Sequence, residues 1–280
     1  MAHTTLVNTA ELAAHIDDPA WVIFDCRHDL GKPDAGAQAY ATAHIPGARF
    51  LHLDRDLSAP PTGKNGRHPL PDPQVFMRTL GAAGVDSTKQ VVAYDAQTGV
   101  YAARLWWMLR WLGHENVAVL DGGYARWTQE GRTLTAAVPQ SAPARFAGQP
   151  RAMWVDADDV MSSLARPGRV LIDARSADRF RGENETLDPV GGRIPGSLNR
   201  FFRENLGANA CFKPAADLRQ AFGAMLGMTP SGAVVHSCGS GVSACHNLLA
   251  MEIAGLPGSR LYPGSWSEWC SDPRRPADKG

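Results

Sequence analysis

The sequence repeats itself, and this repetition limits the possible folds more than any other feature. Five short stretches of the first half return, in the same order, in the second half. The clearest is Val-Ile-Phe-Asp-Cys-Arg at 22–27, which returns as Val-Leu-Ile-Asp-Ala-Arg at 170–175. Matches in a fixed order indicate a duplication. We therefore predict two similar domains rather than one large core.

In both halves, short runs of Val, Ile and Leu alternate with helix-like segments. This alternation is typical of a mostly parallel sheet with helices on both faces. We predict an α/β protein with two tandem domains, at residues 1–135 and 153–280. The stretch 136–152, which contains prolines and shows no clear period, is predicted to link them.

The composition excludes several broad classes of partner. The formal net charge is +0 and the pI is about 7.1, which gives no general attraction to nucleic acid or to anionic membranes. No apolar run approaches the roughly 18 residues of a membrane-spanning helix, and no basic segment followed by an apolar core marks an export signal. The five cysteines show neither a disulfide framework nor zinc-ligand spacing. We expect a cytoplasmic protein with free thiols and no metal.

One cysteine lies at the kind of turn that activates a thiol. Cys238 follows an apolar run predicted as a buried strand, and a helical pattern begins directly after it. Gly239 and Gly241 allow the backbone to fold tightly around the sulfur. Free N–H groups and the positive end of the helix dipole would favour the thiolate. We predict that Cys238 is a nucleophile that solvent can reach. Asp95 occupies the matching position of the first half, so that copy is predicted to be catalytically silent.

Two further stretches are similar to the signature sequences of the rhodanese sulfurtransferases. They are Tyr-Ala-Thr-Ala-His-Ile-Pro-Gly-Ala at 40–48 and Leu-Tyr-Pro-Gly-Ser-Trp-Ser-Glu-Trp at 261–269. The loop Cys-Gly-Ser-Gly-Val-Ser at 238–243 resembles that of the members that use 3-mercaptopyruvate more than that of the thiosulfate-using members. The resemblance implies that a small-molecule donor gives its sulfur to Cys238. The persulfide would pass it to cyanide, a thiol or a thioredoxin-like acceptor, without a metal or organic cofactor.

The resemblance also implies which residues bind the donor. Gly239, Gly241, Val242 and Ser243 would form the loop around it. Arg179 would bind the carboxylate of mercaptopyruvate.

The choice of donor depends on where cations stand. Thiosulfate-type loops carry an Arg-Lys pair after the cysteine, whereas this chain has Gly239 and Ser240 there. A dianion held by backbone dipoles alone should bind less well than one with charged partners, which favours mercaptopyruvate. The members that use mercaptopyruvate have a second arginine where this chain has Asp188, and we name Arg193 as the cation that takes its place.

Loss of sulfur from mercaptopyruvate leaves an enolate that must gain a proton. This step needs a group that exchanges protons near neutral pH, for which histidine is suited. The resemblance implies a relay of Ser240, His68 and Asp54. His68 lies in the irregular, Pro- and Gly-rich stretch 58–73, and loops of that length are often functional.

Three alternatives remain open. The chain could be a thiosulfate:cyanide sulfurtransferase, which differs only in its donor. It could be a sulfur-carrier or binding module without turnover of a free donor. A Cys-dependent phosphatase would need an arginine six residues after the cysteine, where this chain has Ala244.

Overall fold

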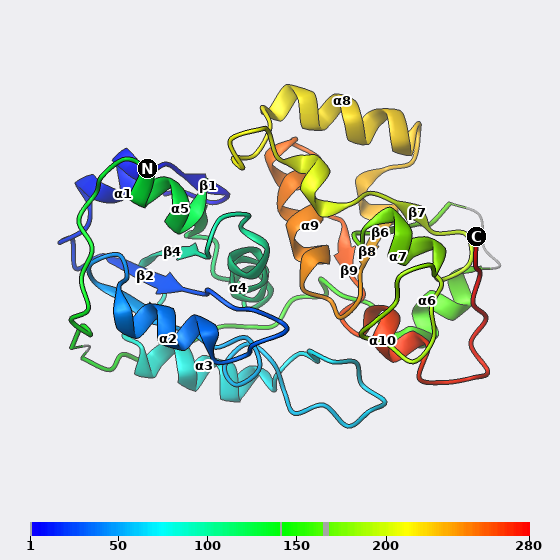
Figure 1. The fold of residues 1–280 in the computed structure, drawn as a ribbon, viewed down its shortest axis with the longest axis horizontal. Helices are drawn as coiled ribbons and strands as arrows, with labels where there is room; N and C mark the ends of the chain where they lie inside the picture. Colours follow the sequence, from blue (N-terminus) through cyan, green and yellow to red (C-terminus); the bar gives the residue numbers. More distant parts are fainter. Residues whose placement is uncertain (1, 141, 165–167) are drawn as a thin grey trace. The chain divides into compact units, whose positions relative to one another are not determined.

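The structure is a computed structural model that describes residues 2–140, 142–164 and 168–280. The chain divides into two compact units (Figure 1). The first consists of Met1–Ala59, Leu70–Arg151 and Ala208–Cys211, and the second of Pro60–Pro69, Ala152–Gly207 and Phe212–Gly280. Each half of the sequence therefore contributes one short segment to the unit formed mainly by the other half.

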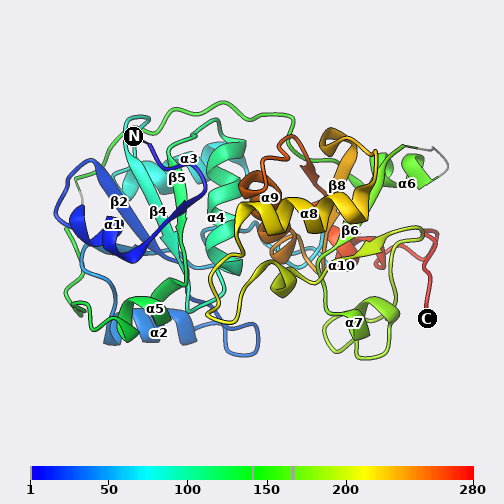
Figure 2. The same cartoon turned by 90° about the horizontal axis from the view of Figure 1, so that it is seen from above.

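The described part of the first unit contains a five-stranded parallel sheet with the order β1-β5-β4-β2-β3. Figure 2 shows β2, β4 and β5 side by side in this sheet. The strands are β1 (Leu6–Val7), β2 (Trp21–Asp25), β3 (Ala48–Phe50), β4 (Gln90–Tyr94) and β5 (Val117–Leu120). The helices are α1 (Thr9–Ala14), α2 (Ala35–Thr42), α3 (Pro73–Ala82), α4 (Val100–Trp111) and α5 (Gly123–Gln129).

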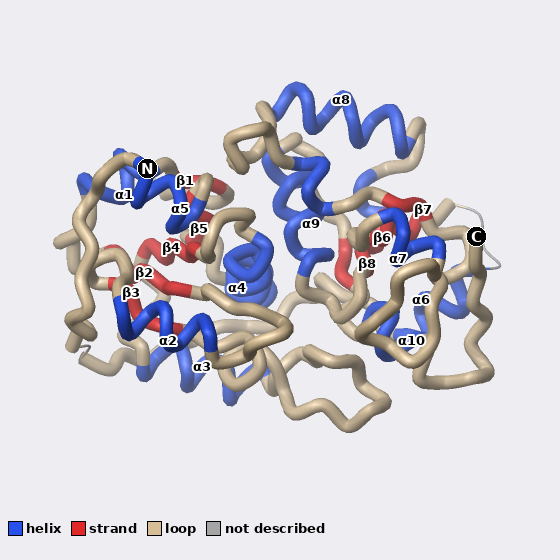
Figure 3. Tube along the Cα trace, viewed as in Figure 1, coloured by secondary structure: helices blue, strands red, loops and turns tan. Residues whose placement is uncertain are grey.

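The second unit repeats this arrangement in a sheet with the order β7-β6-β8-β9, again parallel. Figure 3 shows its strands β6, β7 and β8 in red. Read from its other edge, this order matches β5-β4-β2-β3 of the first unit, as a duplication requires. The strands are β6 (Val170–Asp173), β7 (Leu198–Asn199), β8 (Val234–Ser237) and β9 (Arg260–Leu261). The helices are α6 (Ala157–Leu164), α7 (Ala177–Arg181), α8 (Ala215–Leu226), α9 (Ser243–Ile253) and α10 (Ser265–Trp269), with 3-10 turns η1 (Phe202–Asn205) and η2 (Ser231–Ala233).

Apolar side chains on both faces hold each sheet. In the first unit, Leu12 of α1 and Trp127 of α5 pack with strand residues such as Ile23 and Val92 in one cluster. In the second, one cluster gathers strand residues with α6 and α10, and another gathers them with α8 and α9. Burying the strands on both faces explains their continuous Val, Ile and Leu runs. The predicted fold class, two tandem α/β domains that each contain a parallel sheet, is confirmed.

The repeated Asp-x-Arg sequence forms the same buried ion pair in both units. Arg27 binds Asp25 through Nη2 at 2.6 Å and donates to the Ala43 carbonyl at 2.7 Å. Arg175 binds Asp173 at 2.7 Å and donates to the Gly192 carbonyl at 2.7 Å. Since each arginine joins the end of a strand to the residue two positions before Ile-Pro-Gly, the motif fixes how the chain leaves the sheet.

Candidate active site

Cys238 lies directly after β8, which is an inner strand of its sheet, and shortly before α9. Ligands of open α/β sheets bind at this carboxyl end of the strands. The Gly241 N–H donates to the Cys238 Sγ at 3.1 Å. The backbone of Cys238 is held by Ser265 Oγ at 3.0 Å and by the Trp266 N–H at 3.0 Å. The loop therefore points a peptide N–H at the sulfur from a rigid position.

Gly241 is required for this loop shape. Its φ is +74°, in the left-handed region that side chains disfavour. A Cβ at this position would also lie 2.3 Å from the Pro263 carbonyl oxygen. A larger residue would therefore displace the N–H that contacts the sulfur.

The first unit shows what the equivalent loop binds. The Asp95 carboxylate accepts hydrogen bonds from the N–H groups of Gly99 at 2.9 Å and Tyr101 at 2.8 Å, with Gln97 and Ala102 further away at 3.1 and 3.4 Å. Burial raises the pKa of Asp95, and these backbone hydrogen bonds oppose that shift. The matching loop therefore directs several backbone N–H groups at a single side-chain carboxyl group.

The thiol is less accessible than the sequence suggested. Cys238 is only 2 % exposed, and Ser240 and Val242 are 6 % exposed each. The expectation of a solvent-exposed nucleophile was therefore wrong. The loop and its neighbours cover nearly all of the Cys238 surface.

His68 and Ser240 lie together. His68 Nδ1 is 2.7 Å from Ser240 Oγ, and both residues are buried. His68 belongs to Pro60–Pro69, which packs as part of the second unit. Two contacts anchor this segment at the start of α10: the Arg67 N–H donates to Ser267 Oγ at 3.1 Å, and Gly66 lies against the Gly264 backbone. Two members of the predicted relay are thus placed within hydrogen-bonding distance.

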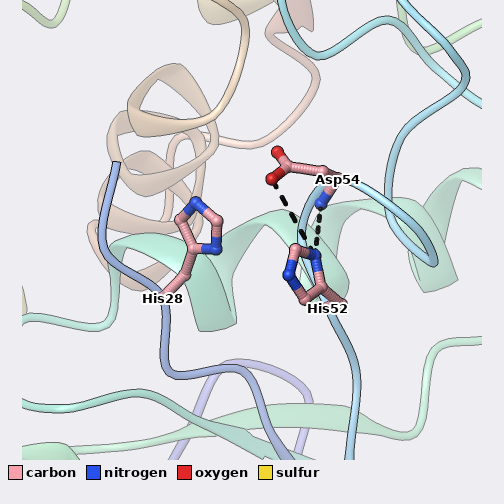
Figure 4. A group of neighbouring side chains, drawn as sticks. All are labelled: His28, His52 and Asp54. Atoms are coloured by element: carbon pink, nitrogen blue, oxygen red, sulfur yellow. Dashed lines mark hydrogen bonds and ion pairs between the residues drawn. The ribbon is translucent and has the colours of Figure 1, made fainter. Parts of the chain in front are cut away.

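Asp54 belongs to the first unit, where it lies beside His52 (Figure 4). The Asp54 N–H donates to His52 Nδ1 at 3.1 Å, and its carboxylate is 3.9 Å from the same nitrogen. The role of Asp54 as the third member of the relay stays a prediction.

His28 lies close to His52 and Asp54. Each of the three residues offers one possible metal-ligand atom, and these atoms lie within 4.8 Å of one another. Burial lowers the pKa of His28, which favours the neutral form that a metal would need. However, His52 Nδ1 accepts the Asp54 N–H, so the proton of the neutral ring is on Nε2. In this tautomer Nδ1 is occupied by the Asp54 N–H and Nε2 carries the proton, so neither ring nitrogen of His52 offers a free lone pair. The donor set as arranged therefore does not fit a metal ion.

Arg179, on α7, faces the loop but is also engaged by acidic groups. Its Nη2 donates to both Glu185 carboxylate oxygens at 2.8 Å and is 3.7 Å from Asp188 Oδ2. Burial opposes ionisation of Glu185, but backbone N–H groups and Arg179 outweigh it and lower the pKa. A Cβ on Gly239 would lie 3.6 Å from Arg179 Nη2, so the guanidinium stands beside the peptide that follows the nucleophile.

Arg193 is engaged elsewhere in the described structure. Its Nη1 donates to the Gly280 carbonyl at 2.6 Å, and its guanidinium lies 4.9 Å from the Phe180 ring centre. None of its contacts among the described residues involves the loop at 238–243. Its contribution to donor binding stays a prediction.

Sequence reasoning missed Arg67 and Glu185. A Cβ on Gly239 would lie 2.8 Å from Arg67 Nη2, closer than Arg179. The only sequence signal for Arg67 was its position next to His68 in the long irregular loop. No feature of the sequence indicated a role for Glu185.

Comparisons with known proteins find relatives that are similar in sequence and in fold. The family model described as Rhodanese-like domain matches residues 8–130 and 156–272. The chain is 47 % identical to the probable 3-mercaptopyruvate sulfurtransferase of Pseudomonas aeruginosa, over 100 % of both chains. It is 36 % identical to the putative thiosulfate sulfurtransferase SseB of Mycobacterium tuberculosis, over 98 % of this chain and 97 % of the relative. The crystal structure of SseA from Escherichia coli superposes with a TM-score of 0.82 at 34 % identity, covering 94 % of this chain and 99 % of that one. Among the described residues, no helix is long and apolar enough to cross a membrane.

Proposed function

This chain belongs to the rhodanese family and is a sulfurtransferase, and from that premise we propose that Cys238 takes a sulfur atom from 3-mercaptopyruvate and passes it to a thiol acceptor. The observation that carries the choice of donor is the hydrogen bond between His68 and Ser240 two residues from the nucleophile. Release of pyruvate requires a proton on carbon, whereas release of sulfite from thiosulfate does not. A buried hydroxyl–imidazole pair at the loop supplies that proton transfer.

The first half-reaction begins with attack of the Cys238 thiolate on the sulfur of mercaptopyruvate. The S–S bond forms as the C–S bond breaks, and its electron pair remains on the donor as the enolate of pyruvate. The donor's S–H proton moves to the pair of His68 and Ser240, which returns a proton to the enolate carbon. Pyruvate leaves, and Cys238 carries a persulfide that the Gly241 N–H helps to stabilise.

The second half-reaction restores the enzyme. A thiol acceptor, such as thioredoxin or a small thiol, attacks the terminal sulfur as its thiolate, and the bond to Cys238 Sγ breaks. Cyanide would react in the same way and yield thiocyanate. We also place the protein in the cytoplasm, because all five cysteines are free and a reducing compartment preserves thiols.

The test uses stoichiometric mercaptopyruvate without an acceptor. Wild-type protein should gain the mass of one sulfur atom and release one equivalent of pyruvate. Cys238→Ser should do neither, whereas Cys270→Ser, which changes a half-buried cysteine outside the loop, should behave as wild type. A persulfide that forms on another cysteine in Cys238→Ser would refute the assignment.

Thiosulfate is a second candidate donor because Arg67 and Arg179 both stand beside Gly239. These cations supply part of the charge that the loop sequence itself lacks. A comparison of kcat/KM for mercaptopyruvate and thiosulfate, with the same acceptor, decides between the two donors. We expect the larger value for mercaptopyruvate.

A further inference from the structure

Arg67 brings a second guanidinium to the loop that carries the nucleophile. It comes from Pro60–Pro69, while Arg179 comes from α7. The two groups approach the same peptide: a Cβ on Gly239 would lie 2.8 Å from Arg67 Nη2 and 3.6 Å from Arg179 Nη2. Their side chains are 28 % and 21 % exposed, so both are largely shielded from water.

Asp188 lies between these two cations. One of its carboxylate oxygens pairs with Arg67 Nη1, and the other is 3.7 Å from Arg179 Nη2 without a hydrogen bond. The Asp188 side chain is 2 % exposed. Burial raises the pKa of Asp188, and the charge of Arg67 opposes that shift. Asp188 therefore holds Arg67 through Nη1 and leaves Nη2 of the same guanidinium available for another acceptor.

Both arginines keep N–H groups for a further anion. Arg67 Nη2 has no acceptor among the described residues, and Arg179 Nε is buried without one. An arginine with free N–H groups in a shielded position suits a carboxylate, because charge-assisted hydrogen bonds are strongest where water is scarce. The free N–H groups and the shared approach to Gly239 are independent features that indicate one anion at this place.

We propose that Arg67 binds the carboxylate of the donor together with Arg179, and that Asp188 is the positioning residue that orients Arg67. The inference rests on the proposed function. It assigns the second cation of the site to the segment of His68, instead of to Arg193 or to position 188, where Asp188 now serves as its counter-ion.

The test compares two donors that differ in their carboxylate alone. Mercaptopyruvate carries it, whereas mercaptoacetone has the same thiol and ketone with a methyl group in its place. In Arg67→Gln, kcat/KM for mercaptopyruvate should fall about tenfold to hundredfold, as expected for the loss of a hydrogen bond to a charged group. The value for mercaptoacetone should stay unchanged. Arg274→Gln, which changes an exposed arginine paired with Asp272, is the matched control and should leave both values unchanged.

The remaining outcomes overturn the inference or the function separately. An equal fall with both donors would assign Arg67 to the shape of the loop, and no fall with either would remove it from the site. If wild-type protein forms no persulfide with either donor, the proposed function itself fails, whatever the variants do.

The double variant Arg67→Gln, Asp188→Asn guards against a folding defect, because it does not leave a buried carboxylate unpaired. It should show the same donor discrimination as Arg67→Gln. Asp188→Asn alone should raise KM for mercaptopyruvate severalfold at constant kcat. In the Arg67→Gln background the same change should have no further effect, since coupled residues are not additive. Additive effects would show that Asp188 does not act through Arg67.

Discussion

Acid should weaken the second unit through His236, which lies in β8 just before the nucleophile. His236 is completely buried, its Nε2 is 3.1 Å from Met251 Sδ, and its Nδ1 has no hydrogen-bond partner. Burial, aided by the positive charge of Arg200, lowers the pKa of His236 from 6.5 to about 3. The folded state therefore keeps this ring neutral where the unfolded state binds a proton.

The sign and size of the effect follow from linkage. Below pH 6.5 the unfolded state binds one proton more than the folded state, so the free energy of unfolding falls as the pH falls towards about 3. The slope is about 1.4 kcal/mol per pH unit for one group. Between about pH 7.5 and about pH 5, His236 alone should remove about 2 kcal/mol. This is a large part of the marginal stability of a typical domain.

Urea unfolding at each pH, followed by a pulse of hydrogen exchange and mass analysis of the β8 peptide, measures the unfolding of this unit. In His236→Gln the pH slope should fall by about 1.4 kcal/mol per unit in the acid range. His114→Gln is the matched control: burial also lowers the pKa of His114, but this residue belongs to the first unit. Identical slopes in wild type and His236→Gln would refute the reasoning.

Three further changes test the site and its support. His68→Gln should slow persulfide formation from mercaptopyruvate about a hundredfold, as loss of an acid–base group does. Sulfur transfer from thiosulfate should keep its rate. Equal losses of rate with the two donors in stopped-flow assays would remove His68 from the relay. Arg175→Ala removes a cation that is 1 % exposed and leaves the buried Asp173 carboxylate without its cation, so it should cost about 3–5 kcal/mol in urea unfolding. Arg274→Ala, at an exposed pair, should change little. Gly241→Ala should abolish persulfide formation because the added methyl group would clash with the backbone of Pro263. Gly196 also has a positive φ but open space around it, so Gly196→Ala is the control and should keep its activity. Activity retained in Gly241→Ala would contradict the loop argument.

Features carried by local sequence or by the repeat were predictable. The duplication predicted two similar α/β domains with parallel sheets, and the turn after a buried strand located Cys238. The contrast between Asp95 and Cys238 needed only the alignment of one half with the other. Each of these inferences depends on residues close together in the chain or on a repeat that the sequence displays.

Features created by long-range pairing were not predictable. Arg67 and Asp188 are 121 positions apart, and nothing in the intervening residues fixes their approach. The low exposure of Cys238 likewise depends on what packs over the loop, including a segment from the other half of the chain. Arg193 was chosen as a cation near a motif, but its side chain contacts the last residue of the chain.

The path of Pro60–Pro69 has a consequence for biosynthesis and for evolution. This segment leaves the ribosome long before the residues against which it packs, so His68 has no serine to bond until the last part of the chain has been made. A gene encoding only the second half would produce a nucleophile without its histidine. A gene encoding only the first half would likewise lack Ala208–Cys211, so separation of the two halves into different genes would cost each unit one of its segments.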